Sequence, residues 1–167
     1  MAKLQNRRHF ASDNYSGVHP QIMKALEKAN EGHAAAYGDD AYTKKAEERF
    51  QKLFGDVEVF FVFNGTAANV LSLKSMIDPH EAVICSSKAH IQEDECGAPE
   101  HQLGCKLVLI PSSSGKITPD EIKKVMILNG DQHKIQTRAI SITQSTEMGR
   151  VYTPKELDQN LPARKKE

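Results

Sequence analysis

The sequence predicts an α/β fold with a mainly parallel β-sheet and helices on both faces of that sheet. One observation behind this prediction is that short apolar segments alternate along the chain with segments whose apolar residues recur at helical spacing. Another is that residues 118–121 (TPDE) and 153–156 (TPKE) share a helix-start pattern, a capping box with proline at the first helical position. Strands that alternate with helices favour parallel pairing.

Several of the predicted elements have a clear start or stop signal. Pro20 suits the first turn of the first helix, Gly55 closes the second helix, and Pro79 ends the third. Helices are expected over residues 18–33, 42–54, 67–77, 119–128 (to about Leu128) and from 154 onward. Strands are expected over residues 57–63, 82–85, 106–110 and 139–143.

Length, charge and hydropathy limit the classes of protein to which the chain can belong. The 167 residues are enough for one domain with a core. We expect an arm over residues 1–18 and a domain over 19–167 that is incomplete, because little chain follows the last predicted helix. The 22 basic and 22 acidic residues balance, which gives no sign of a nucleic-acid binder. The longest apolar run, residues 59–63, is far shorter than the roughly 20 residues of a membrane span. We therefore expect a cytoplasmic protein without nucleic-acid or membrane partners.

Three cysteines raise the question of a metal site. Cys85, Cys96 and Cys105 lie in one stretch with His90 and His101, and zinc takes both ligand types. Structural zinc sites pair their ligands at short spacings such as C-x2-C, and no such pair occurs here. We therefore predict no metal, and small buried thiols are the preferred interpretation.

The stretch VFFVFNGTAAN (residues 59–69) is the strongest candidate for a binding site. A glycine at the end of a predicted strand allows close backbone approach, and the Thr66 hydroxyl could cap the following helix. The free N–H groups of a helix start form an anion site. Neither G-x-x-x-x-G-K-[ST] nor G-x-G-x-x-G occurs here, which removes the common nucleotide motifs. From the residues alone, a phosphate site and an ordinary capped turn both stay open.

Five motifs in the same order make the chain resemble the threonine aldolase family. These are enzymes that depend on pyridoxal 5′-phosphate (PLP) and have the fold of PLP-dependent transferases of fold type I. The resemblance runs from about Phe10 to Leu157. Its motif TQSTE is most similar to the low-specificity and phenylserine-aldolase branch of the family. The motifs are FASDNYSGVHP, YGDDAYT, NGTAAN, AHIQEDECGAPE and TQSTEMGRVYTPKEL. The resemblance implies cleavage of threonine-like β-hydroxy-α-amino acids to glycine and an aldehyde.

The resemblance also implies where the cofactor binds. Gly65, Thr66 and Ala67 would hold the 5′-phosphate through helix-start N–H groups and the threonine hydroxyl. His90 matches the histidine that stacks on the pyridine ring and takes part in catalysis. Without the surrounding motif, His90 would be interpreted as a lone exposed histidine.

Two carboxylates are the other predicted catalytic residues. Glu95 matches the acidic residue near the reacting β-hydroxyl, where a carboxylate could take part in proton transfer. The alternative for residues 93–95 (EDE) is a solvated acidic turn. Glu147 stands where many threonine aldolases have a catalytic histidine, which puts the usual assignment of the base in doubt.

Substrate and partner contacts follow from the same resemblance. Ser12 matches the serine near the substrate carboxylate. Tyr37 matches a tyrosine at the edge of the active site, near the site of the neighbouring subunit, and without the motif it would be a half-buried loop aromatic. The expected partners are therefore an amino-acid substrate and further copies of the chain.

The lysine that binds PLP covalently is not found in a matching motif. In the family this lysine, and the Asp-Gly-Ala-Arg segment that precedes it, would come after residue 167, and Lys88 near His90 matches neither. We therefore expect these 167 residues to be inactive alone. The alternative function is a non-catalytic fragment that binds a phosphate or a partner chain.

Overall fold

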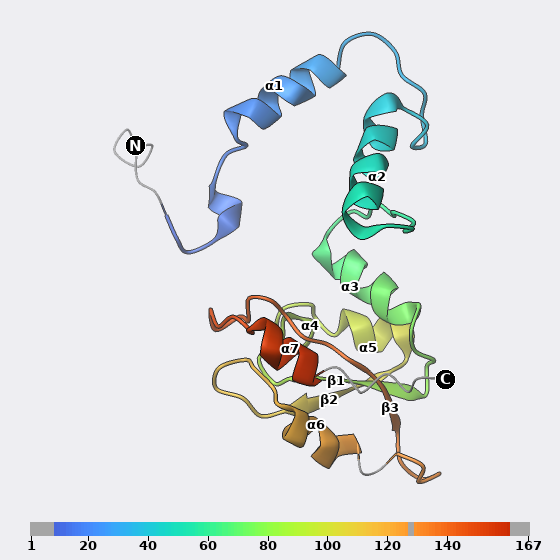
Figure 1. Ribbon diagram of the computed structural model, residues 1–167, viewed down its shortest axis with the longest axis vertical. Coiled ribbons are helices and arrows are strands. Elements are labelled where there is room, and N and C mark those ends of the chain that lie inside the picture. Colours follow the sequence, from blue (N-terminus) through green and yellow to red (C-terminus); the bar gives the residue numbers. More distant parts are fainter. Residues whose placement is uncertain (1–8, 127–128, 161–167) are drawn as a thin grey trace. The chain divides into compact units, whose positions relative to one another are not determined.

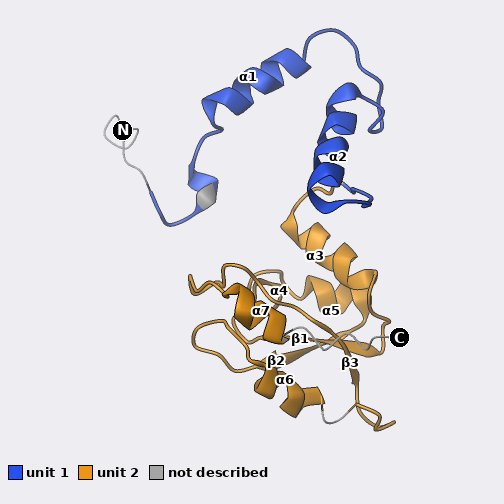
Figure 2. Ribbon diagram, in the orientation of Figure 1, with its two compact units in different colours: residues 1–60 blue, residues 61–167 orange. Residues whose placement is uncertain are grey.

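The computed structural model describes residues 9–126 and 129–160. The chain divides into two units, Met1–Phe60 and Phe61–Glu167, which Figure 2 shows in different colours. The predicted division into an arm over 1–18 and a domain over 19–167 stays a prediction.

The first unit is helical. After the short 3-10 helix η1 (Asp13–Tyr15) come α1 (Pro20–Ala29) and α2 (Ala41–Phe54), close to the predicted positions (Figure 1). The carboxylate of Asp40 caps α2: it accepts hydrogen bonds from the amides of Tyr42 and Thr43 at 2.8 and 2.9 Å. Gly55 ends α2 with φ 83°, a left-handed conformation that favours glycine.

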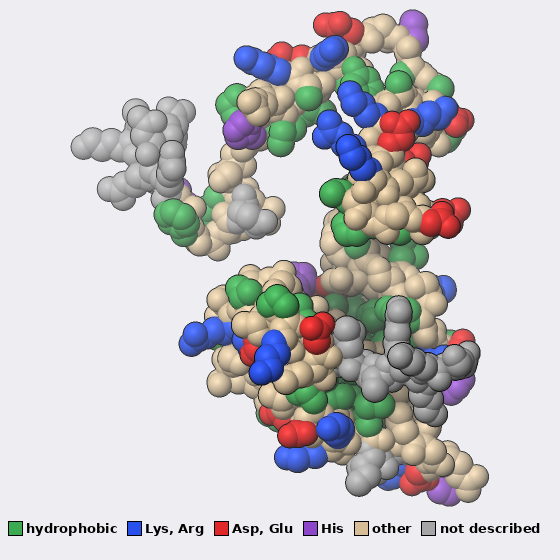
Figure 3. All heavy atoms as spheres, viewed as in Figure 1, with side chains coloured by type: hydrophobic (Ala, Val, Ile, Leu, Met, Phe, Trp, Pro, Cys, Tyr) green, Lys and Arg blue, Asp and Glu red, His purple; other side chains and the backbone are tan. Residues whose placement is uncertain are grey.

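Apolar side chains of this unit lie on the surface. The described helices α1 and α2 contain no buried residue, and Leu26 and Phe54 are 54% and 67% exposed. Apolar and charged side chains both appear on the outside of these helices (Figure 3). The apolar stripes that predicted both helices are therefore not buried within the described part of this unit.

The predicted strand over residues 57–63 is wrong. These residues form no strand, and Phe60 and Phe63 are 78% and 97% exposed. A strand needs a neighbour for its backbone hydrogen bonds, and a high β-propensity cannot supply one.

The second unit contains a parallel sheet with the order β2-β1-β3. Its strands are β1 (Glu81–Ser86), β2 (Lys106–Ile110) and β3 (Gln136–Ile140). The first two match the prediction, and β3 begins three residues earlier than predicted. Polar Gln136 and Thr137 pair with Glu81 and Ala82 of β1, so pairing, rather than apolar character, sets the start of β3.

Helices cover both faces of this sheet, as predicted. On one face, Val83 and Cys85 of β1 join a buried cluster with Leu73 of α3 (Gly65–Lys74) and Leu103 of α5 (Ala98–Leu103). On the other face, Ile84 joins a cluster that includes Ile122 of α6 (Pro119–Met126). Successive residues of β1 thus point to opposite faces, and the central strand is buried on both.

The two predicted capping boxes are confirmed. At the start of α6, the carboxylate of Glu121 accepts hydrogen bonds from the amide and hydroxyl of Thr118 at 2.9 and 2.6 Å. At the start of α7 (Pro154–Asn160), Glu156 accepts the same bonds from Thr153 at 2.7 and 2.9 Å. The predicted end of the α6 helix near Leu128 lies outside the described residues.

Two short α-helices were not predicted, α4 (His90–Glu93) and α5, and neither was the 3-10 helix η1. Each is too short to show a helical repeat in the sequence. Among the described residues no helix is both long and apolar enough to cross a membrane.

Candidate functional site

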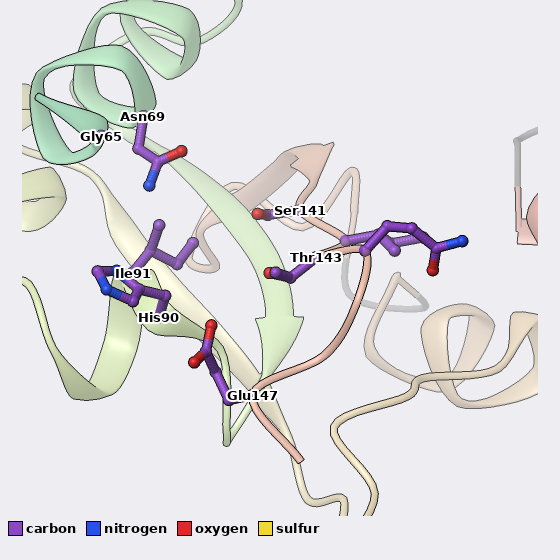
Figure 4. A pocket seen from close by; sticks show the side chains of 9 residues that line it. Gly65, Asn69, His90, Ile91, Ser141, Thr143 and Glu147 are labelled. Carbon is purple, nitrogen blue, oxygen red and sulfur yellow. The ribbon is translucent and has the colours of Figure 1, made fainter. Parts of the chain in front are cut away.

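A pocket of about 430 Å³ opens in the second unit, where three segments meet. The segments are the first half of α3, the start of α4 and the chain that follows β3 (Figure 4). The lining residues are Gly65, Asn69, His90, Ile91, Ser141, Ile142, Thr143, Gln144 and Glu147. The pocket therefore contains three of the predicted site residues, Gly65, His90 and Glu147.

The N-terminus of α3 contributes Gly65 to the lining of this pocket. The helix begins at Gly65 rather than near Ala67. Its cap is Asn64 rather than Thr66, because the Asn64 Oδ1 accepts the amide of Ala67 at 2.8 Å. Within the described residues, no hydrogen bond is recorded for the amides of Gly65 and Thr66. With the helix dipole behind them, these two amides form a potential anion site.

Gly65 leaves room for a ligand at that site. A Cβ atom built at this position meets no atom within 4 Å, so packing in this chain does not require glycine there. The open space allows a ligand to reach the backbone amides closely. The role predicted for Ala67 in phosphate binding stays a prediction, and its amide donates to Asn64.

His90 lies at the first position of α4 and contacts a buried carboxylate. Its Nδ1 is 2.8 Å from Oε1 of Glu95, and the side chain of Glu95 is 0% exposed while that of His90 is 45% exposed. The hydrogen bond with Glu95 raises the pKa of His90, burial opposes this, and the charges of Glu95, Glu147 and Asp94 raise it further. The interpretation of residues 93–95 as a solvated acidic turn is thus wrong for Glu95.

Asn69 is the residue of this site that the sequence analysis missed. Its Nδ2 donates to Oε1 of Glu95 at 2.6 Å, the same oxygen that His90 contacts. Figure 4 shows the Asn69 amide directed from α3 toward the side of the pocket with His90 and Ile91. The spacing from Gly65 was a usable signal, because residues four apart lie on the same face of a helix.

Glu147 reaches the pocket from a loop that is fixed by hydrogen bonds. The preceding residue, Thr146, is buried, and its hydroxyl donates to the carbonyl of Ser114 at 2.8 Å and accepts from the amide of Arg150 at 3.1 Å. The Gln144 side chain makes two hydrogen bonds with the backbone of Tyr152, at 2.8 and 2.9 Å. These contacts fix the loop that places Glu147 at the pocket, while Met148 on its other side is 53% exposed.

The predicted substrate residues belong to the first unit. The hydroxyl of Ser12 accepts the amide of Asn14 at 3.2 Å, and Tyr37 is fully exposed with φ 62°. The roles given to Ser12 and Tyr37 stay predictions.

No group of three or more His, Cys, Asp or Glu side chains is placed to hold a metal ion in the part of the chain that the structure describes. Cys85 and Cys105 are buried and Cys96 is exposed. Burial raises the pKa of the Cys85 thiol to about 12.

Comparisons with known proteins agree with this fold. A family model described as beta-eliminating lyase matches residues 9–164. The chain therefore belongs to the beta-eliminating lyase family.

Its relatives include threonine aldolases. The chain is 53% identical over 150 residues to a low specificity L-threonine aldolase of Pseudomonas sp. and 28% identical over 149 residues to one of Saccharomyces cerevisiae. The alignments cover 89% and 87% of this chain. A solved structure of Leishmania major threonine aldolase matches with a TM-score of 0.81 and 32% identity over 86% of this chain. This match confirms the predicted fold, the PLP-dependent fold type I.

The chain spans less than half of these relatives. It covers 43% of the Pseudomonas sp. protein, 38% of the yeast protein and 42% of the Leishmania major chain. The likeness therefore concerns part of each enzyme.

Proposed function

We propose that this chain forms the phosphate- and ring-binding part of a PLP-dependent aldolase that cleaves threonine-like β-hydroxy-α-amino acids to glycine and an aldehyde. The observation that carries the proposal is the pocket that joins Gly65, at the start of α3, to His90, whose ring contacts the buried Glu95. The names of the relatives support the substrate class.

The residues present fit PLP. The amides of Gly65 and Thr66, with the positive end of the helix dipole, would bind the 5′-phosphate, and the open space at Gly65 permits that contact. The ring of His90, 45% exposed at the pocket, would lie against the pyridine ring. When bound, PLP supplies the electron sink for breaking a bond to the α-carbon.

The carboxylates of Glu147 and Glu95 would move or hold protons beside the proposed cofactor site. Glu147 lines the pocket and can accept a proton from a hydroxyl group of the substrate. Glu95 is fully buried and acts through His90 in this proposal. Ser12 would contact the substrate carboxylate. The chain is also proposed to form a homo-oligomer, in which Tyr37 would lie near the site of a second copy.

The proposal is tested by equilibrium dialysis of the 167-residue chain against PLP and against pyridoxal, which lacks only the phosphate. PLP should bind at least about tenfold more tightly, because charge-assisted hydrogen bonds to the amides of α3 are lost with pyridoxal. Incubation with threonine and phenylserine then measures release of aldehyde.

Gly65→Asp supplies the matched variant. It places a negative charge at the proposed phosphate site, and a Cβ there meets open space, so the fold should persist. Gly17→Asp is the control, since Gly17 also has open space around it. We expect Gly65→Asp to abolish the preference for PLP and Gly17→Asp to keep it. Equal affinity for the two ligands in the unaltered chain would contradict the proposal.

A further inference from the structure

The carboxylate of Glu95 is buried with all of its recorded hydrogen bonds on one oxygen. Its Oε1 contacts Asn69 Nδ2 at 2.6 Å and His90 Nδ1 at 2.8 Å. Its Oε2 is also buried and has no partner among the described residues. A buried carboxylate with few hydrogen-bond donors is costly, so each of the two donors is important for stabilising Glu95 in its buried position.

The chemistry of this contact fixes the protonation of His90. A carboxylate accepts hydrogen bonds, so the Nδ1 of His90 carries a proton. In the neutral ring, Nε2 is then the bare nitrogen. Glu95 therefore sets both the tautomer and the orientation of His90, in the way that carboxylates orient histidine ligands at metal sites.

Asn69 connects this pair to the anion site. It lies on α3 one helical turn after Gly65, and α3 packs against α5 through a shared buried cluster. A single amide side chain thus links the helix that offers the phosphate donors to the histidine of the pocket.

We propose that Asn69 is a positioning residue: with His90 it holds the carboxylate of Glu95, and through Glu95 it fixes the ring of His90 relative to the anion site on α3. This inference rests on the proposed function in one respect: the proposed function gives His90 its role, which is contact with the pyridine ring of PLP. Its test reads His90 directly and needs neither cofactor nor activity, so failure of one proposal is distinguishable from failure of the other.

The test is a pH titration of the His90 ring by NMR in the 167-residue chain, with His90→Gln to assign the signal. Asn69→Ala removes one donor from Glu95, and the carboxylate then holds the imidazolium proton more strongly. The midpoint of His90 should rise by about one pH unit, as expected for the loss of one hydrogen bond to a charged group. Asn69→Leu, which keeps the branching at Cγ but has no hydrogen-bond donor, should give the same shift.

A double-mutant cycle separates a link through Glu95 from a general effect on the fold. Glu95→Gln should lower the His90 midpoint, and Asn69→Ala added to Glu95→Gln should leave it unchanged. Asn129→Ala is the control: the Asn129 side chain bonds the backbone of Thr137 at 2.9 and 3.1 Å, away from the pocket lining. It should not move His90.

Three outcomes would overturn the inference. One is an unchanged His90 midpoint in Asn69→Ala and Asn69→Leu. Another is an equal shift with and without Glu95. The third is loss of the folded NMR spectrum in both variants, which would make Asn69 a residue of the fold rather than a positioning residue.

Discussion

At the scale of single residues, the backbone of Gly115 lies close to Thr146, a residue of the loop that carries Glu147. Gly115 has φ +77°, and a Cβ built there would lie 2.8 Å from the Cβ of Thr146. Thr146 in turn is held by Ser114 and Arg150. Both the backbone conformation and the available space therefore require glycine at this position.

We predict that Gly115→Ala destabilises the protein strongly. The left-handed conformation and the contact with Thr146 should together lower the free energy of unfolding by about 2–4 kcal/mol. The control is Gly149→Ala, because Gly149 has a similar φ of +70° and no atom within 4 Å of its Cβ position. Chemical denaturation measures both variants. Equal losses would show that backbone strain alone, without the contact, explains the effect.

The ion pair at the pocket should make stability depend on pH. Glu95 raises the pKa of His90 above its usual 6.5 in the folded protein. This pair therefore stabilises the folded state fully below the unfolded pKa, and the contribution is lost as the pH rises through the raised pKa. The stability difference between the unaltered chain and His90→Gln, measured by denaturation, should shrink between mildly acidic and alkaline pH. A difference that grows with pH would contradict this assignment.

At the scale of elements, the two capping boxes differ in one charged neighbour. Lys116 Nζ lies 2.9 Å from the Glu156 carboxylate at α7 and 5.2 Å from the centre of the Tyr152 ring. The hydroxyl of Tyr152 also accepts the amide of Ile117 at 2.7 Å. These contacts connect the start of α7 to the segment that leads into α6.

Glu156→Gln and Glu121→Gln form a matched pair at these two boxes. Hydrogen bonds from Thr153, with the bond and charge of Lys116, lower the pKa of Glu156 to about 2. Its stabilising contribution is therefore present above the unfolded pKa of 4.5 and is lost as the pH falls through about 2. At neutral pH, thermal unfolding should show a larger decrease in Tm for Glu156→Gln than for Glu121→Gln. Near pH 2 the two decreases should converge, and a difference that persists there would refute the role of the charge.

Local signals in the sequence predicted much of the fold. They failed where the structure of a segment depends on contacts with residues far away in the sequence. The boxes at Thr118 and Thr153 depend on residues three apart, and β1 and β2 appear as apolar runs. Residues 57–63 would form a strand only beside a neighbouring strand, and no local pattern in the sequence shows whether such a neighbour is present. In the site, motifs identified His90 and Gly65, whereas the bond from Asn69 to Glu95 joins residues 26 apart and became visible only with the fold.

At the scale of the whole molecule, large apolar side chains are exposed in the first residues of the second unit. Phe61 and Phe63 are 59% and 97% exposed. Exposed apolar patches of this kind mark sites of association. The proposed contact between copies of the chain would cover such surface.

We predict that Phe63→Ser reduces self-association with little change in folding. The side chain is 97% exposed, so the free energy of unfolding should change by no more than about 0.5 kcal/mol. Sedimentation velocity across a concentration series measures association. Phe63→Leu is the control, since it keeps an apolar side chain and should still associate. A Phe63→Ser protein that associates like the unaltered chain would exclude this surface.

The central claim is that the N-terminus of α3 binds the phosphate of PLP while His90 lies against its ring. The measurement that tests it most directly is an NMR titration of the 167-residue chain with PLP and, in parallel, with pyridoxal. We predict that PLP shifts the amide signals of Gly65 and Thr66, that pyridoxal leaves them nearly unchanged, and that both ligands shift the His90 ring. Amide shifts that are the same for both ligands, or that lie away from α3, would contradict the account.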